Sequence, residues 1–191
     1  MTPEGYKFSI KLNKQITHIS KLQVTDEVRQ RVTYILDTTQ ILGDKIGALL
    51  IQLPPSFTFD LKHLETFLAF FTQEVRARTF AFDVAIEFRN KYWFNDQTYA
   101  LLQKYNVALV AADSSRYPGV RKVTADIAYI RMHGPTKLFA SSYAREQLQE
   151  LTEYINNIRT AVKRIYVYFN NDFHGYAIQN AQTLQHLLEK E

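Results

Sequence analysis

Five segments of the sequence share one pattern: a run of β-branched and apolar residues that ends abruptly in charged or amide side chains. They are LLIQLPPSF, FDVAIEFRN, VALVAADSS, IAYIRMHGP and RIYVYFNND. Each run is almost continuously apolar and is followed by helical periodicity, which predicts parallel strands covered on both faces and joined by crossover helices. Ligands bind at the carboxyl ends of such strands. The pattern therefore predicts a functional site at the strand ends.

Composition narrows the class of protein. With 191 residues and 46% hydrophobic content, the chain can bury a sizeable core, and we predict a single domain over residues 1–191. The sequence has no cysteine, which excludes disulfides and thiolate chemistry. No segment has the apolar length of a membrane span or a signal peptide, so we expect a cytoplasmic protein with no membrane partner. A formal charge of +4 favours anionic partners in general.

Helix signals lie between the predicted strands. Thr25 and Asp60 cap two predicted helices, Asn95 opens a shorter one, and Ser141 or Ser142 caps the longest. With YKFSIKL as an additional first strand, about six strand and helix units result, which fits an open doubly wound sheet or a (β/α)8 barrel. The sequence contains no Gly-rich phosphate-binding turn. Polar residues at every strand end favour the barrel.

Several of these segments also occur together, and in the same order, in a known family. LGDKIGALLIQLPPSF, AIEFRNKYWF, the Ala-Asp of VAADSS, YIRMHGP and YVYFNNDFHGYAIQNA resemble the signature segments of the YecE-like family, a domain of unknown function with a TIM-barrel fold. TPEGYKFSIKLNKQITH, which contains Lys11 and His18, resembles the third strand of that family. The family's usual Gly-Thr-Ser-Gly-Trp and Val-Glu-x-Asn strands do not occur. The resemblance implies an N-terminally truncated TIM barrel of about six β/α units, whose open edge would allow self-association.

Strand alternation selects candidate site residues among the strand ends. On AFDVAIEFR, Glu87 and Arg89 share a parity, whereas Val84, Ile86 and Phe88 form the apolar set expected to pack against helices. By similar reasoning, the side chains expected in the upper interior layer or walls of the barrel are Lys11, Gln52, Glu87, Arg89, Trp93, Asp113, Tyr129, Arg131, His133 and Asn170.

These residue types point to an enzyme that acts on an anionic or polyhydroxylated small molecule by acid/base-assisted hydrolysis. Glu87, Asp113 and His133 are the predicted catalytic residues, because carboxylates and imidazoles transfer protons. The cations would hold a phosphate or carboxylate, and the amides would orient hydroxyl groups. No cofactor is expected. The residues predicted to bind the substrate are Lys11, Gln52, Arg89, Trp93, Arg131, Asn170 and Asn171.

Other interpretations of the same residues stay open. A buried Lys11 would form a Schiff base with a carbonyl substrate, which predicts a lyase. Alternatively, the charges would form a structural ion-pair network. Arg116, Arg121 and Lys122 form a basic loop, but no RNA or DNA motif accompanies them, which disfavours nucleic acid as a partner. A non-catalytic scaffold is a further alternative. The histidines and carboxylates lack the spacing of a metal motif, so no metal is expected.

Two of the candidates have a concrete structural alternative. Asn171 lies just before the final helix, whose free backbone amides would bind an anion, but asparagine also favours turns. In that case Asn180 would only pin the last helix to the loop. Trp93 would stack on a sugar or a base, although packing is the commoner role of such an aromatic side chain.

Overall fold

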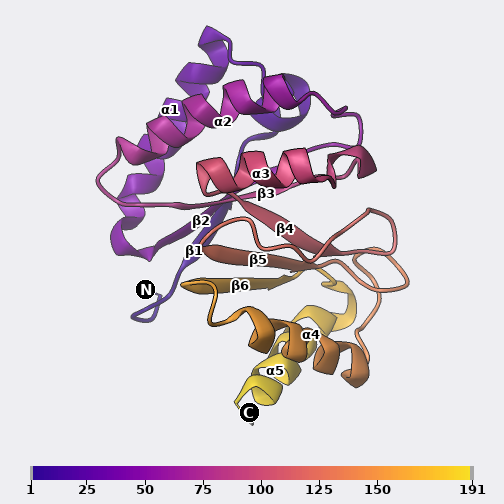
Figure 1. Ribbon diagram of the computed structural model, residues 1–191. Coiled ribbons are helices and arrows are strands. Elements are labelled where there is room, and N and C mark those ends of the chain that lie inside the picture. Colours follow the sequence, from indigo (N-terminus) through magenta and orange to yellow (C-terminus); the bar gives the residue numbers. More distant parts are fainter. Residues whose placement is uncertain (1, 190–191) are drawn as a thin grey trace. The chain divides into compact units, whose positions relative to one another are not determined.

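A computed structural model describes residues 2–189. The chain divides into two compact units, of which the first ends at Val107 and the second begins at Ala108. Each unit contains three parallel strands, hydrogen-bonded in chain order, and the helices that follow them (Figure 1). The predicted α/β class and parallel strands are therefore confirmed. The single domain stays a prediction.

Unit 1 contains β1 (Phe8–Lys11), β2 (Ile46–Gln52) and β3 (Asp83–Glu87). Every residue of β2 is buried, as expected for the central strand of three. The helices of this unit lie together on one side of its strands (Figure 1). They are α1 (Asp26–Thr39), α2 (Leu61–Arg76) and α3 (Asp96–Tyr105), with the short turns η1 (Gln15–Ile19), η2 (Gln40–Lys45) and η3 (Lys91–Trp93).

The helices of unit 1 begin where their capping residues predict. The side chains of Thr25, Asp60 and Asn95 each accept a hydrogen bond from the backbone amide three residues later, at 3.3, 2.9 and 3.0 Å. Each cap satisfies an amide that has no partner within the helix. In the part of the chain that the structure describes, no helix is both long enough and apolar enough to cross a membrane.

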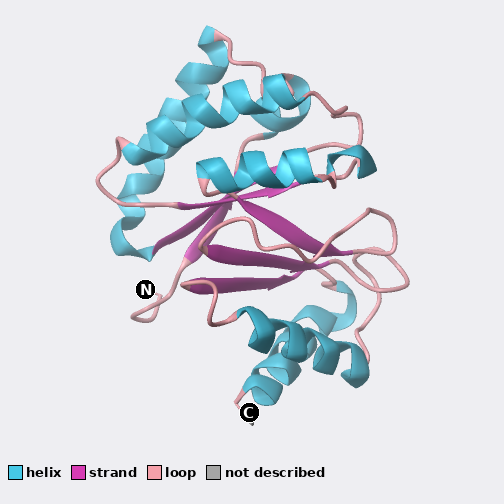
Figure 2. Ribbon diagram, viewed as in Figure 1, coloured by secondary structure: helices cyan, strands magenta, loops and turns pink. Residues whose placement is uncertain are grey.

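Unit 2 contains β4 (Ala108–Asp113), β5 (Ile127–Met132) and β6 (Arg164–Phe169), followed by η4 (Phe173–Gly175). Its two helices, α4 (Arg145–Ile158) and α5 (Tyr176–Leu188), pack against each other on one side of these strands (Figures 1 and 2). Apolar side chains from the strands and both helices form one core, to which Ile130, Leu151 and Leu184 contribute. This core covers one face of the β4–β6 sheet.

The prediction that a helix follows every strand is wrong after β4. Residues 114–126 contain no helix and lead directly to β5. Gly119 packs this loop tightly against the strand, because a Cβ atom at this position would lie 1.8 Å from the carbonyl oxygen of Ala112. Only a glycine permits so close an approach to the backbone.

The predicted cap of the longest helix is also wrong. The N-cap of α4 is Ala144, and its backbone amide donates to the side chain of Gln147 at 2.9 Å. The hydroxyl of Ser141 accepts hydrogen bonds from the amides of Thr136 and Lys137 instead, at 3.1 and 3.0 Å. The serine therefore stabilises its own turn and is not available to cap the helix.

Candidate functional site

The carboxyl ends of β1, β2 and β3 present a group of polar side chains, which we call the β1–β3 tip cluster: Lys11, His18, Gln52, Glu87 and Arg89. Gln52 and Glu87 are aligned in the register of β2 and β3, and Lys11 lies two residues before them in the register of β1 and β2. Side chains two residues apart on neighbouring parallel strands point to the same face. Lys11, Gln52 and Glu87 therefore point to the same face of the sheet, as strand alternation predicts.

The centre of the cluster is a buried ion pair. The Nε–H of Arg89 donates to Oε1 of Glu87 at 3.0 Å, and the two side chains are 13% and 1% exposed. Gln52 beside them is 7% exposed. Charges removed from water in this way stabilise each other, because loss of one partner removes part of what compensates the burial of the other.

His18 lies in η1, the turn that follows β1. Its neighbour Thr17 is 1% exposed and anchors the turn, and the Thr17 hydroxyl lies 2.9 Å from Nδ1 of His18. Burial lowers the pKa of His18, and the positive charges of Lys11, Arg89 and Lys14 lower it further. The ends of these strands therefore carry positive charge that acts on the imidazole.

In unit 2 the structure brings Arg131 and Asn170 together. Nε of Arg131 donates to Oδ1 of Asn170 at 3.1 Å. Arg131 is aligned with Tyr168 in the register of β5 and β6, and the rings of Tyr129 and Tyr168 stack with centroids 5.1 Å apart. This face of the sheet thus combines a guanidinium, an amide and aromatic rings.

Asp113 lies apart from Arg131. The register aligns Asp113 with Met132, one residue out of phase with Arg131, so its side chain points to the opposite face, where Met132 belongs to the core under α4 and α5. There the hydroxyl of Tyr143 donates to Asp113 at 2.8 Å and accepts from the amide of Gly134 at 2.9 Å. Burial, followed by the hydrogen bond to Asp113, raises the pKa of Tyr143.

His133 and Asn171 are both buried in unit 2. His133 is 1% exposed, and its ring contacts that of Phe139 edge-on at 5.5 Å. Nδ2 of Asn171 donates to the Ser141 carbonyl at 2.9 Å and to Oδ1 of Asn180 at 2.8 Å. These bonds join the end of β6 to the 141–143 loop and to α5, as the structural alternative for these asparagines expects.

Trp93 packs inside unit 1. It is fully buried and stacks on Phe57 and Phe88, with ring centroids 5.2 and 4.7 Å away. Its indole N–H donates to the Phe57 carbonyl at 3.0 Å. This environment satisfies both the ring and its polar atom, which favours packing over contact with a ligand.

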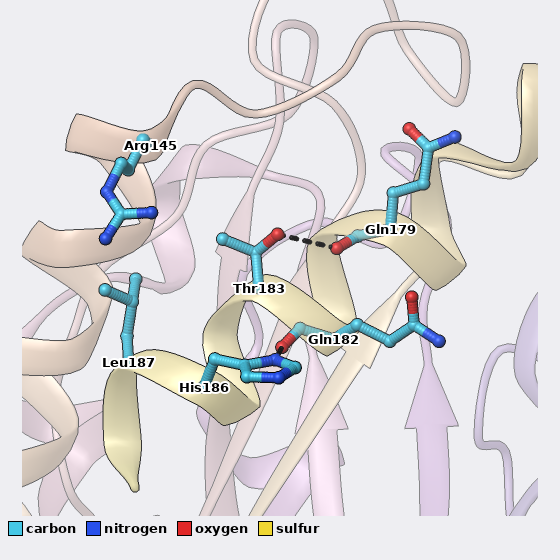
Figure 3. Close-up of a pocket in the computed structure, with 6 residues that line it drawn as sticks. All are labelled: Arg145, Gln179, Gln182, Thr183, His186 and Leu187. Carbon is cyan, nitrogen blue, oxygen red and sulfur yellow. Dashed lines mark hydrogen bonds between the residues drawn. The ribbon is translucent and has the colours of Figure 1, made fainter. Parts of the chain in front are cut away.

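A cavity of about 430 Å³ lies between the first residue of α4 and one side of α5 (Figure 3). Thr183 and His186 in its wall donate hydrogen bonds to the carbonyls of Gln179 and Gln182, one turn earlier in α5, at 2.8 and 2.7 Å. The lining residues are Arg145, Gln179, Gln182, Thr183, His186 and Leu187, and no predicted site residue is among them.

Sequence reasoning assigned no role to Thr17 or to Tyr143, and none to His18. Their importance follows from hydrogen bonds that only the folded chain forms, although His18 lies in a segment that resembles the YecE-like family. Among residues 2–189, no three histidine, aspartate or glutamate side chains are placed to hold a metal ion.

The parallel strands and the helices that follow them, with charged side chains at the carboxyl ends of the strands, define an α/β protein. Over residues 1–191 the sequence matches the family described as "Protein of unknown function DUF72". The chain belongs to that family, which confirms the resemblance to the YecE-like domain.

The similar proteins include one curated relative and two solved structures of the DUF72 family. The UPF0759 protein YunF of Bacillus subtilis is 21% identical, over all of this chain and 76% of its own length. The crystal structure of a DUF72 family protein from Thermotoga maritima is 27% identical, with a TM-score of 0.83 over 98% of this chain and 75% of that chain. A DUF72 family protein from Enterococcus faecalis, at 21% identity, has a TM-score of 0.81 over 98% of this chain and 76% of its own.

Proposed function

We propose that the chain forms part of a cytoplasmic enzyme of the (β/α)8-barrel type. In this proposal, the β1–β3 tip cluster binds the phosphate or carboxylate of a small molecule, and the enzyme acts on that molecule by acid/base-assisted hydrolysis. The observation that carries the proposal is the buried pair of Glu87 and Arg89, 3.0 Å apart, on the same sheet face as Gln52 and Lys11. Charged groups gathered where such folds bind ligands favour a site over a structural device.

The balance of charge favours an anionic ligand. Glu87 neutralises Arg89, and the positive charges of Lys11 and Lys14 also act on His18. A phosphate or carboxylate placed among these groups would compensate the excess positive charge, and a guanidinium suits either anion because its donors match two oxygens at once.

The position of Lys11 favours hydrolysis over Schiff-base chemistry. Lys11 is exposed at the end of β1. A Schiff-base lysine is commonly activated by burial in an apolar pocket, and an exposed amine lacks that environment. Lys11 is better suited to attract and hold an anion.

Binding is tested by titrating the 15N-labelled protein with inorganic phosphate, and separately with acetate, while its amide resonances are recorded. We expect saturable shifts at the ends of β1, β2 and β3, weakened several-fold in Lys11→Met. Lys62→Met removes an exposed lysine from α2 and serves as the matched control. Equal titration curves for the two variants, or no saturable shift at those strand ends, would contradict the proposed anion site.

Hydrolysis is tested with p-nitrophenyl phosphate and p-nitrophenyl acetate as general probes. We expect slow turnover of one of them, and a lower turnover in Glu87→Gln, because this variant loses the charge that holds Arg89 in place at the cluster. Unfolding of the same variant in urea separates this role from a structural network. A large loss of stability with unchanged turnover would assign Glu87 to structure alone.

A further inference from the structure

The hydrogen bonds of Thr17 favour one tautomer of His18. The Thr17 hydroxyl donates to the carbonyl of Asn13 at 3.2 Å, and it lies 2.9 Å from Nδ1 of His18. A hydroxyl has one proton to donate, so with that proton on Asn13 it can only accept from the imidazole. With Thr17 donating to Asn13, Nδ1 of His18 carries the proton, and Nε2 of the neutral ring holds a lone pair.

The His18 side chain is more exposed to solvent than Glu87, the carboxylate of the same cluster. The His18 side chain is partly exposed, and Nε2 has no hydrogen-bond partner among the residues that the structure describes. Glu87 is 1% exposed and holds Arg89 at 3.0 Å. Transfer of a proton to Glu87 would weaken this buried pair, whereas transfer to Nε2 breaks no bond within the cluster.

The charges around His18 keep the ring ready to accept a proton. Burial, and then the cations of Lys11, Arg89 and Lys14, lower the pKa of His18 below its ordinary value, which favours the neutral ring. An anion bound to the same cations would cancel part of their effect and raise the pKa of His18. Ligand binding would thus increase the basicity of Nε2 at the moment when a proton must be taken.

We propose that His18 is the residue that takes and returns the proton at the β1–β3 tip cluster, with Thr17 as its positioning residue. This inference rests on the proposed function and assigns the proton transfer within it. Nε2 takes a proton from a water molecule as the water oxygen bonds to the phosphorus or carbonyl carbon of the substrate. The bond to the leaving oxygen then breaks, and the leaving oxygen takes the proton back from Nε2, so that atoms and charge balance.

The first test is the tautomer of His18, read from the long-range 1H–15N spectrum of the imidazole at pH 7. We expect the Nδ1–H form in the wild type and in Thr17→Ser, and a shift toward the Nε2–H form in Thr17→Val. Thr66→Val, which removes an exposed hydroxyl in α2 that donates to the Lys62 carbonyl, is the matched control. An Nε2–H or protonated His18 in the wild type would overturn the inference.

The second test is the reactivity of Nε2 toward diethyl pyrocarbonate, which acylates neutral imidazole nitrogens, followed by peptide mass spectrometry. We expect His18 to react faster than the buried His133, and inorganic phosphate to slow its acylation. Phosphate should lose most of this effect in Lys11→Met. A His18 no more reactive than His133 would overturn the inference, even where phosphate shifts the amides of the strand ends.

The two proposals fail in different ways. A reactive Nδ1–H His18 that phosphate does not protect would support the assignment of Nε2 as proton acceptor and would contradict the anion site of the proposed function. Protection with the wrong tautomer would support the anion site and remove His18 as its base.

Discussion

Replacing Asn180 with alanine should destabilise the protein through the 141–143 loop. Asn180 is 4% exposed, its Oδ1 accepts from the amide of Tyr143 at 3.1 Å, and its Nδ2 donates to the carbonyl of Tyr143 at 3.2 Å. Alanine leaves both buried backbone groups without these partners. Each such group costs about 1.5 kcal/mol, so we expect Asn180→Ala to lose about 3 kcal/mol of unfolding free energy.

Urea unfolding followed by far-UV circular dichroism measures this loss. With an m-value of about 2 kcal/mol/M, the midpoint should fall by about 1.5 M at unchanged m. Fluorescence is unsuitable, because Trp93, the single tryptophan, lies in unit 1. Gln182→Ala, an exposed change in the same helix, should stay within about 0.5 kcal/mol of the wild type. A midpoint shift for Asn180→Ala no larger than that of Gln182→Ala would refute the reasoning.

Three further predictions address the loop after β4 and the β1–β3 tip cluster. Gly119→Ala should cost about 2 kcal/mol or more in urea unfolding, because its Cβ would meet the Ala112 carbonyl at 1.8 Å; an unchanged midpoint would contradict this contact. Arg89→Met should cost about 3 kcal/mol by removing the guanidinium that pairs with the buried Glu87 carboxylate, and adding Glu87→Gln should recover part of the loss; a double variant as unstable as the single one would exclude this cause. The pKa of His18 is lower in the folded chain than its ordinary 6.5, so the unfolded state binds the proton of His18 more tightly than the folded state does. The stability that His18 contributes is therefore complete above pH 6.5 and is lost as the pH falls below that value. His18→Gln should therefore flatten the fall in unfolding free energy between about pH 7.5 and about pH 5.5, and an equally steep fall in the variant would disprove the assignment.

The sequence alone predicted the elements whose causes are local. The apolar runs became the strands, and Thr25, Asp60 and Asn95 cap the helices that they precede, because a side-chain cap acts on an amide three residues away. Ser141 is the exception: its hydroxyl finds nearer amides in its own turn. The sequence also predicted that Glu87 and Arg89 lie on one face, since residues two apart at a strand end share a face.

Only the tertiary structure decided which candidate site residues share a face of the sheet and which do not. Strand alternation gives the parity of residues within one strand, but the relation between two strands depends on their register, and the register places Asp113 and Arg131 on opposite faces. The tautomer of His18 likewise depends on the Thr17 hydroxyl, and its pKa depends on charges from β1 and from Arg89 beyond β3. Hydrogen-bond direction and electrostatic influence act through space between distant parts of the chain, so local sequence patterns predict which residues end the strands, and the fold determines which of them act together.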